Sequence, residues 1–515
     1  MTLLTVDKLD LNINGTPILR DVSFSIEQGK ILGVIGESGS GKSMTAYSIM
    51  KLLPDGSSPS GDIHLDGFNV SDASEEEMCS LRGNDLGMVF QEPMTALNPV
   101  KTIGEQVAET AVIHGKADRK EAMTIARTTL DRVELPEARF PLSRYPHELS
   151  GGQRQRVVIA MAIALRPKLL IADEPTTALD VTTQAEILAL LKRLVLEDNV
   201  GLMMITHDLA VISNLADDIV IMKSGEIVER GSTRNVFQEM KHPYTKKLFE
   251  ASSHVPNKDD HERNPDKPLL VVKDVIRDYP MPRISIFDRP GSFRAVDSVS
   301  FNLQRGENLG LVGESGCGKS TLTRAILGLD TIQGGSIHID GDLVIAGRHI
   351  NRSVRRKMQV VFQDPYGSFN PRHKISRLVA EPMYLLDEMP NKVEKSEQVA
   401  EMLERVGLAA DDKDKYIHEF SGGQRQRIAI ARALIINPEL IILDEAVSAL
   451  DVSIRAQILD LLAELSSTLG LSYLFISHDL SVVRSITDRV LVMKDGKIVE
   501  QGETAQIFDN PAVEY

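Results

Sequence analysis

Short apolar segments of strand length alternate with longer, helix-favouring segments, and the whole pattern occurs twice. In each half an apolar run precedes a glycine-rich loop, at 31–35 (ILGVI) and 308–312 (NLGLV). Another run ends in two acidic residues (LLIADE at 169–174, LIILDE at 440–445), and a third precedes a histidine (LMMITH, YLFISH). Strands alternating with helices predict an α/β core with a largely parallel sheet.

Two further segments recur in each half. A polar, helix-favouring insert spans 94–148 and again 366–419. Near the end, IVIMKSGEIVERG and VLVMKDGKIVEQG each join two apolar runs through Ser-Gly or Asp-Gly. These dipeptides favour the tight turn of a β-hairpin, so we predict a hairpin in both places.

The sequence motifs themselves are also repeated in the same order. SGGQRQR occurs at 150–156 and 421–427, and GESGSGKS at 36–43 returns as GESGCGKS at 313–320. Two colinear copies of one domain explain this order, and short solenoid repeats do not. The polar segment 251–268 contains three prolines and is predicted to be an exposed linker. The predicted domains are therefore 1–250 and 269–515.

Composition restricts the class of protein. The 515 residues are 42% hydrophobic and carry a net charge of −15, which argues against non-specific binding to nucleic-acid phosphates. Two cysteines, Cys79 and Cys317, exclude a disulfide framework, a four-cysteine zinc site and an all-cysteine iron–sulfur cluster. The apolar run Val157–Leu165 is too short to span a bilayer, and the N-terminus lacks secretory-signal features. We expect a cytoplasmic protein that reaches a membrane only through a partner.

The glycine-rich loops match GxxxxGK[ST], the pattern of a phosphate-binding loop. Glycines let backbone N–H groups converge on phosphate oxygens at a helix N-terminus, where the helix dipole favours anions. The lysine is expected to reach the β- and γ-phosphates, and the following serine to bind Mg²⁺. The residues expected to contact the phosphates are Gly36, Ser38, Gly39, Ser40, Gly41, Lys42, Ser43 and Met44 in the first copy, and Gly313, Ser315, Gly316, Cys317, Gly318, Lys319, Ser320 and Thr321 in the second.

The acidic pair at the end of a strand adds candidate catalytic groups. Asp173 and Asp444 are expected beside Mg²⁺, and Glu174 and Glu445 are expected to polarise the attacking water as general bases. A solvated acidic turn is the alternative, and a phosphate loop in the same domain makes it the weaker one.

The SGGQ segments indicate which class of phosphate-loop enzyme this is. Small residues at a helix start form a second anion site, which is useful if it closes over the nucleotide of another domain. With LSGGQ at 149–153 and FSGGQ at 420–424, the chain resembles the ATP-binding-cassette ATPases over nearly its whole length. The resemblance implies an α/β fold of two tandem P-loop ATPase domains, each with a RecA-like core, an antiparallel β subdomain and an α-helical subdomain.

The resemblance also assigns roles to further residues. Gln91 and Gln363 match the loop that senses Mg²⁺ and the membrane partner, and His207 and His478 match the histidine that contacts the γ-phosphate. Residues 178–180 and 449–451 match the D-loop. Domains of this family pair head to tail, so each signature would close the phosphate loop of the other domain. The signature residues expected at the nucleotide are Ser421, Gly422, Gly423 and Gln424 for the Lys42 site, and Ser150, Gly151, Gly152 and Gln153 for the Lys319 site.

The copies depart from the family pattern in three places. The family stacks adenine on an aromatic residue; Tyr279 fits that position in the second copy, whereas the first copy has Ile13. Met44 stands where Thr321 supplies a hydroxyl, and Ala446 replaces the proline found at 175. Both copies keep the lysine, glutamate, histidine and signature, so we predict that both sites hydrolyse ATP.

The tail after the first domain indicates which subgroup of the family the chain resembles. HPYT within FQEMKHPYTKKL resembles the tail of the ATPases of bacterial dipeptide/oligopeptide importers, and the two cassettes are fused here, as in the importer of microcin C and related peptides. Tyr515 aligns with Tyr244, so the second tail is expected to be cut at Tyr515. A soluble tandem cassette, such as a ribosome-associated translation factor, is the alternative; those carry a long charged helical arm, whereas this linker is short and contains prolines.

The resemblance therefore implies the ATP-hydrolysing subunit of a bacterial peptide importer. One copy per transporter would work with two membrane permease subunits at the cytoplasmic face of the inner membrane, and a periplasmic binding protein would deliver the substrate. ATP and Mg²⁺ are the expected ligands. The sequence leaves open whether the substrate is a dipeptide, an oligopeptide, a peptide-nucleotide antibiotic or glutathione.

Overall fold

A computed structural model describes residues 1–91, 93–177, 179–256, 267–281, 291–347, 351–364, 367–448 and 450–512. The chain divides into two compact units: the first is made of Met1–Ser253 and Asp451–Ser453, and the second of His254–Leu450 and Ile454–Tyr515. The middle of the predicted linker, the D-loop alanines Ala178 and Ala449, and Tyr515 lie outside the described residues. In the described ranges, no helix combines the length and the hydropathy that crossing a bilayer requires.

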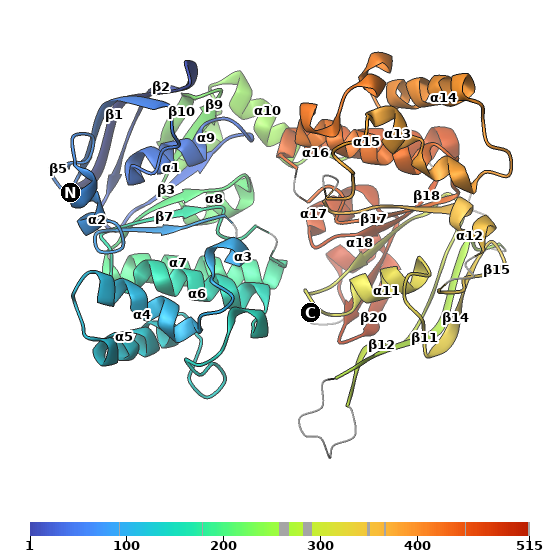
Figure 1. Cartoon of the computed structure of the whole chain (residues 1–515), viewed down its shortest axis with the longest axis horizontal. Coiled ribbons are helices and arrows are strands. Elements are labelled where there is room, and N and C mark those ends of the chain that lie inside the picture. Colours follow the sequence, from blue (N-terminus) through green and yellow to red (C-terminus); the bar gives the residue numbers. More distant parts are fainter. Residues whose placement is uncertain are drawn as a thin grey trace. The chain divides into compact units, whose positions relative to one another are not determined.

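The first unit contains two sheets and ten α-helices among its described residues (Figure 1). Its strands are β1 (Thr2–Ile13), β2 (Thr16–Glu27), β3 (Ile31–Ile35), β4 (Ser57–Leu65), β5 (Phe68–Asn69), β6 (Leu86–Val89), β7 (Leu169–Asp173), β8 (Gly201–Ile205), β9 (Asp218–Lys223) and β10 (Glu226–Ser232). Its helices are α1 (Lys42–Met50), α2 (Glu75–Leu81), α3 (Pro93–Ala96), α4 (Ile103–Ile113), α5 (Arg119–Arg132), α6 (Gly151–Ile163), α7 (Val181–Asp198), α8 (Leu209–Leu215), α9 (Thr233–Glu239) and α10 (Pro243–Ser252), with the 3-10 turn η1 (Pro146–Glu148).

The larger sheet of the first unit is buried on both faces. Its order is β10-β9-β3-β8-β7-β6, and every pairing is parallel except that of β10 with β9. Alternate residues of β7 belong to different cores: Leu169 and Ile171 face α1 and the smaller sheet, whereas Leu170 and Ala172 face the helices. This alternation explains the continuous apolar runs in the sequence and confirms the predicted parallel core.

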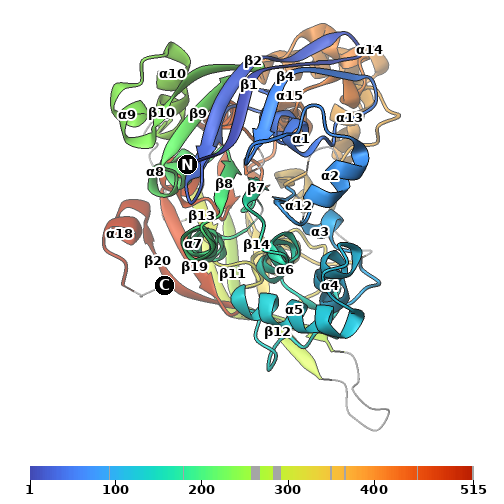
Figure 2. The same ribbon diagram turned by 90° about the vertical axis from the view of Figure 1, so that its left-hand side faces the viewer.

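The smaller sheet and the helical insert cover opposite faces of this core. The smaller sheet is antiparallel, in the order β2-β1-β4-β5, and α1 lies between it and the larger sheet (Figure 1). On the other face α6 and α7 run beneath β7 and β8, with α4 and α5 packed beyond α6 (Figure 2). The insert predicted at 94–148 therefore forms the outer helical layer.

The second unit repeats this plan with sheets ordered β16-β17-β18-β13-β19-β20 and β12-β11-β14-β15. Its strands are β11 (Leu270–Pro280), β12 (Ser292–Leu303), β13 (Asn308–Val312), β14 (Gly334–Ile339), β15 (Asp342–Leu343), β16 (Met358–Val361), β17 (Leu440–Asp444), β18 (Ser472–Ile476), β19 (Arg489–Lys494) and β20 (Lys497–Glu503). Its helices are α11 (Lys319–Ile326), α12 (Arg352–Lys357), α13 (Ile375–Val379), α14 (Lys392–Arg405), α15 (Gly422–Leu434), α16 (Val452–Leu469), α17 (Leu480–Ile486) and α18 (Thr504–Asp509), with the 3-10 turns η2 (Glu381–Leu385), η3 (Ala410–Asp414) and η4 (Ile417–Glu419).

One difference between the helical layers of the two units lies at α4. The first unit has the 11-residue helix α4, whereas the second has the five-residue α13 followed by the 3-10 turn η2. Pro382 lies in the first turn of η2, and its ring and missing N–H prevent the α-helix from continuing. The predicted hairpins are confirmed: β9 pairs with β10 and β19 with β20, and the turn residues Ser224 and Asp495 have the positive φ that such turns require.

A glycine in the middle of each strand that precedes the phosphate loop allows a helix to pack closely on the sheet. A Cβ added to Gly33 would lie 2.8 Å from Cδ1 and 2.9 Å from Cγ2 of Ile212 on α8. A Cβ on Gly310 would lie 2.9 Å from Cγ1 of Val483 on α17. The same close approach therefore explains both glycines.

We expect Gly33→Ala to destabilise the first unit by about 1–3 kcal/mol, because the added methyl overpacks the β3–α8 contact. Ile212→Ala removes both clashing carbons, so the double variant should be more stable than the sum of the two single effects predicts, by at least about 0.5 kcal/mol. Urea unfolding of the four proteins measures this coupling. Strict additivity would show that the helix does not press on this glycine.

Candidate functional site

The phosphate loop of each unit requires its glycines for two reasons. Gly41 and Gly318, at the N-caps of α1 and α11, have φ values of 100° and 111°, which favour glycine. A Cβ on Gly36 would lie 2.3 Å from the carbonyl oxygen of Met222, and one on Gly313 would lie 2.1 Å from that of Met493. The loops are therefore held tightly against β9 and β19.

The lysine of each loop is buried at the loop's centre. Lys42 Nζ donates to the carbonyl oxygens of Gly36 (2.8 Å) and Glu37 (3.0 Å), and burial lowers the pKa of this lysine. Lys319 Nζ donates to those of Gly313 (2.6 Å) and Glu314 (2.8 Å). Both ammonium groups thus lie over the N-terminus of the following helix, where an anion would meet a cation and free N–H groups.

The two loops differ at one buried position. Ser40 is 4% exposed, and its hydroxyl has no hydrogen-bond partner among the described residues. Cys317 takes the same place in the second loop, where burial raises the pKa of its thiol and Lys319 Nζ lies 3.8 Å from Sγ. A buried polar atom without a partner is unusual, so the Ser40 hydroxyl fits a site for a polar ligand.

The acidic pairs lie at the carboxyl ends of β7 and β17. Burial raises the pKa of Asp173, and a hydrogen bond from Ser43 acts in the opposite direction. Burial likewise raises the pKa of Asp444. Asp173 is thus buried and Asp444 partly buried, each with a charged form that is poorly compensated, which is the setting in which a cation would bind.

The glutamate after each aspartate adopts a left-handed backbone conformation. Glu174 has φ of 48° and Glu445 has φ of 51°, values that cost a residue with a side chain about 1–2 kcal/mol. Their N–H groups donate to the carbonyl oxygens of Ile205 (2.9 Å) and Ile476 (2.8 Å) on the neighbouring strands. The turn directs both side chains toward the histidines that follow those strands, and strain of this kind is typical of functional sites.

Glu174 is the centre of a hydrogen-bond network. His207 Nδ1 lies 3.3 Å from Oε1, while Gln91 Nε2 and Thr177 Oγ1 each donate to Oε2 at 2.9 Å. Burial alone would raise the pKa of Glu174, but the hydrogen bonds of His207 and Thr177 and the charge of Lys42 outweigh it and lower the pKa to about 2. The carboxylate is therefore ionised at neutral pH.

The second unit has a sparser version of this network. His478 Nδ1 lies 3.3 Å from Oε1 of Glu445, and its hydrogen bond and charge lower the pKa of Glu445 against the effect of burial. Ser448, at the position of Thr177, donates instead to the backbone oxygen of Glu445 at 2.9 Å. Gln363 lies beside Asp444 in the lining of a cavity.

The signature segments form the N-termini of α6 and α15. Ser150 accepts from the Gln153 N–H, and the Gln153 side chain accepts from the Ser150 N–H at 3.0 Å; Ser421 and Gln424 repeat this capping box. Ser150 and Gly151, like Ser421 and Gly422, are exposed. Each signature helix therefore presents its positive end to solvent.

The predicted base-stacking positions lie on equivalent strands. Ile13 ends β1, is half-buried and packs against the core, with Thr16 as its cross-strand partner. Tyr279 lies on β11 opposite Phe293, which is 55% exposed, and donates its hydroxyl to Asp330 at 2.9 Å. The Arg277 guanidinium lies 4.4 Å from the Tyr279 ring centre and covers one ring face. Of the two predicted base-stacking positions, the one on the second unit's hairpin is aromatic, with Tyr279 opposite Phe293. Sequence analysis missed Phe293.

The structure brings most of the predicted residues of the first unit together. Hydrogen bonds, an ion pair and charge interactions join Lys42, Ser43, Asp173, Glu174, Gln91 and His207 into one cluster at the carboxyl edge of the sheet. Sequence analysis missed Thr177, which a hydroxyl three residues after the glutamate could have indicated. It also missed a contact between the HPYT tail and the phosphate loop.

Comparison with known proteins defines the class. The ABC transporter family profile matches residues 19–177 and 296–448, and that of the oligopeptide/dipeptide transporter C-terminal region matches 228–273. Glutathione import ATP-binding proteins GsiA of Escherichia coli O157:H7 and Shigella sonnei (strain Ss046) are both 46% identical to this chain, covering 96% of it and 85% of the relative. A solved dimeric ATP-binding cassette, MJ0796, bound to ADP and Pi, is 31% identical over 45% of this chain and 99% of its own, with a TM-score of 0.40.

The chain belongs to the ABC transporter family. It is an ATP-binding, ATP-hydrolysing protein with two tandem cassettes of α/β fold, of the oligopeptide/dipeptide transporter type. The predicted family, fold class and ATPase activity are thereby confirmed. The roles of the individual site residues stay predictions.

We expect the Lys319 site to bind adenine nucleotides more tightly than the Lys42 site. Stacking of a base on an aromatic ring contributes about 1–3 kcal/mol, and Tyr279 supplies the ring only in the second cassette. Titrating Mg–ADP into Lys42→Ala and Lys319→Ala proteins measures each site separately. Ile13→Tyr should tighten the weaker site and Tyr279→Ala should weaken the stronger one; equal affinities at the outset would contradict the expected order.

Proposed function

We propose that this chain is the energy-supplying subunit of a bacterial peptide importer, with small peptides such as dipeptides, oligopeptides or glutathione as cargo. Two observations support the peptide class: the tail of the oligopeptide/dipeptide type, and the 46% identity over nearly the whole chain to proteins named for glutathione import. The tail also disfavours the alternative, a soluble tandem cassette such as a ribosome-associated translation factor.

The observation that carries the proposed chemistry is the pairing of a strained glutamate with a histidine in both cassettes. Glu174 and Glu445 would orient the attacking water, and His207 and His478 would contact the γ-phosphate. The His207 contact is the strongest influence that holds the pKa of Glu174 low. If His207 turned to the γ-phosphate, the largest influence that lowers the pKa of Glu174 would be withdrawn, which would make the glutamate a better base.

Mg²⁺ would be held by Ser43 and Asp173 in the first cassette and by Ser320 and Asp444 in the second, with Gln91 and Gln363 nearby. The donor groups fit: Asp173 is buried and accepts from Ser43, Asp444 is partly buried, and Mg²⁺ commonly takes one or two carboxylates and completes its shell with water and phosphate oxygens. Bound there, the ion neutralises charge on the phosphates. The cation would also compensate the burial that raises the pKa of both aspartates.

We further propose that each signature helix completes the ATP site of the other cassette during turnover. Residues Ser421–Gln424 would close over Lys42, and Ser150–Gln153 over Lys319. The exposed positive ends of α6 and α15 support this role, because a helix N-terminus stabilises the charge of a phosphate. Binding of ATP would then draw the cassettes together, and hydrolysis would release them.

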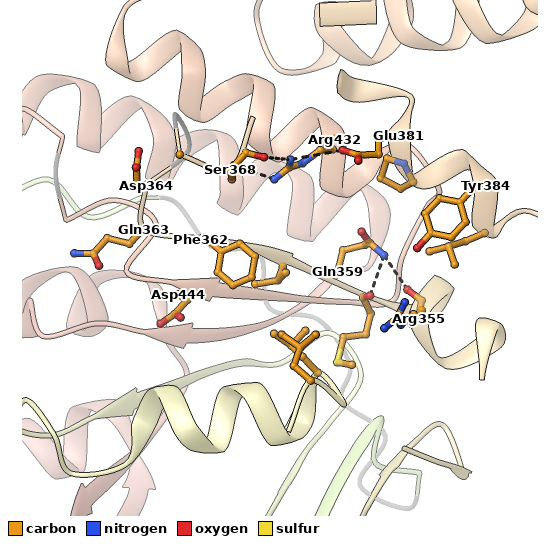
Figure 3. A pocket seen from close by; sticks show the side chains of 17 residues that line it. Arg355, Gln359, Phe362, Gln363, Asp364, Ser368, Glu381, Tyr384, Arg432 and Asp444 are labelled. Carbon is orange, nitrogen blue, oxygen red and sulfur yellow. Dashed lines mark hydrogen bonds and ion pairs between the residues drawn. The ribbon is translucent and has the colours of Figure 1, made fainter. Parts of the chain in front are cut away.

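We propose that a permease subunit docks at a cavity of about 830 Å³ in the second cassette. It lies beside Gln363, and its lining includes the exposed apolar residues Leu329, Phe362 and Tyr384. Arg432 spans its upper edge, donating to Ser368 O (3.0 Å) and Oγ (3.1 Å) and lying 4.0 Å from Glu381 (Figure 3). An amphipathic cytoplasmic helix of a permease would fit this combination of exposed apolar residues and charged side chains. The chain would thus work as a peripheral protein at the cytoplasmic face of the inner membrane.

Replacing Glu174 and Glu445 by Gln tests the chemistry. Because Lys, Ser and Asp are untouched, ATP and Mg²⁺ should still bind, whereas the double variant should lose about 10²–10⁴-fold in hydrolysis, the usual contribution of a general base. Each single variant should slow turnover substantially. Steady-state ATPase with the permeases present, with nucleotide occupancy measured in parallel, checks this. An unchanged rate in Glu174→Gln together with loss of activity in Glu445→Gln would contradict two working sites.

Purification of the intact complex tests the partners. We expect one copy of this chain with two permease subunits, because one chain contains both cassettes. Tyr384→Asp should reduce co-purification at least tenfold without changing nucleotide binding, since a charge in the cavity opposes an apolar partner. Val393→Asp is the matched control, because Val393 is 65% exposed on α14 and does not line the cavity. Two copies per permease pair would contradict the proposed assembly, and equal co-purification of both variants would contradict the docking site.

A further inference from the structure

The HPYT segment at 242–245 has no part in the ATP chemistry described above, yet each of its residues has a defined contact. His242 caps α10 by accepting the Tyr244 N–H on Nδ1 at 3.1 Å, and Pro243 follows in the first turn, where its missing N–H costs nothing. Thr245 is fully buried and donates its hydroxyl to Glu229 on β10. The motif therefore fixes the start of α10 rather than forming a loose tail.

Glu229 is the anchor of this segment. Its carboxylate accepts the N–H groups of Lys241 (2.9 Å) and His242 (3.1 Å) and the hydroxyl of Thr245 (2.5 Å). Hydrogen bonds to a charged acceptor are stronger than neutral ones. Three of them on one side chain hold the first turn of α10 in a single orientation on the core.

That orientation brings Tyr244 against the phosphate loop. Tyr244 is 6% exposed, and its hydroxyl oxygen accepts the backbone N–H of Glu37 at 3.2 Å. Lys223 Nζ lies 5.0 Å from the centre of its ring. Burial raises the pKa of Tyr244 to about 12, and a hydrogen bond to the Glu37 side chain acts in the same direction.

Glu37 is also the residue through which the loop holds its lysine. The Glu37 carbonyl oxygen accepts one of the hydrogen bonds of Lys42 Nζ, and Gly36 beside it accepts another. Tyr244 thus fixes the N–H side of a peptide segment whose carbonyl groups orient the ammonium group. One backbone segment, Gly36–Glu37, therefore contacts both the tail and the lysine. Its N–H donates to Tyr244, and its carbonyl oxygens accept from Lys42, which is expected to contact the phosphates.

We propose that Tyr244 is a positioning residue for the first ATP site, and that the peptide-transporter tail serves to hold the phosphate loop in its nucleotide-binding form. The inference rests on the proposed function, since it takes the Lys42 loop to bind nucleotide. Tyr244 acts through Glu37 and does not itself contact the phosphates. Loss of its hydroxyl leaves the Glu37 N–H without its partner and lets the loop sample other conformations.

The test measures Mg–ADP affinity and stoichiometry by calorimetry in two backgrounds. Lys319→Ala disables the second site, so binding to the first site is measured in that background. Lys42→Ala disables the first site, so binding to the second site is measured. Tyr244→Phe keeps the ring and its contact with Lys223 but removes the hydroxyl. We expect it to weaken Mg–ADP binding about 3–10-fold in the Lys319→Ala background and by less than twofold in the Lys42→Ala background.

The remaining outcomes overturn the inference in distinguishable ways. Unchanged affinity at the first site would mean that the tail does not position the loop. Equal weakening at both sites, or fewer binding sites with unchanged affinity, would mean that Tyr244 only stabilises the fold. If the Lys319→Ala protein with an intact Tyr244 bound no Mg–ADP, the proposed function of the Lys42 loop would fail and the inference with it.

Discussion

Each cassette depends on a parallel sheet that is buried on both faces. Such a sheet has no solvated face on which polar groups could lie, so they are restricted to its edges and ends. The carboxyl ends of β3, β7 and β8 meet at one edge, and they deliver the lysine, the acidic pair and the histidine to the same place. Because these groups are crowded at one edge, the backbone at Glu174 is left-handed and Lys42 Nζ makes short hydrogen bonds to two carbonyl oxygens.

The two cassettes share this plan but not its details. The first has the denser network around its glutamate, through Gln91 and Thr177, and a tail that contacts the phosphate loop. The second has the aromatic hairpin of Tyr279 and Phe293, a helix broken at Pro382 and a cavity beside Gln363. The first cassette is thus the more elaborate around its glutamate and phosphate loop, and the second around its aromatic hairpin and its cavity.

Sequence analysis predicted the features that depend on local patterns. Apolar runs, turn dipeptides and repeated motifs were sufficient for the parallel core, the hairpins and the membership of the family, because each is encoded within a few consecutive residues. Contacts between distant residues were missed for the opposite reason. Nothing in the sequence around Tyr244 indicates Glu37, 207 positions away, and nothing near Arg277 shows that its guanidinium covers one face of Tyr279. Such pairs follow from packing, which only the folded chain displays.

The left-handed backbone at Glu174 and Glu445 also affects what a substitution at these two positions would do to stability. Glycine or asparagine would adopt that conformation at little cost, so either replacement would relieve about 1 kcal/mol of strain while removing the carboxylate. At Glu174, however, the same replacement would also remove the contacts with His207 and Thr177 that lower the pKa of the carboxylate and thereby stabilise the folded chain. The strained backbone and these side-chain contacts therefore have opposite effects on stability, so loss of the glutamate would exchange a charged hydrogen-bond network for a relaxed turn.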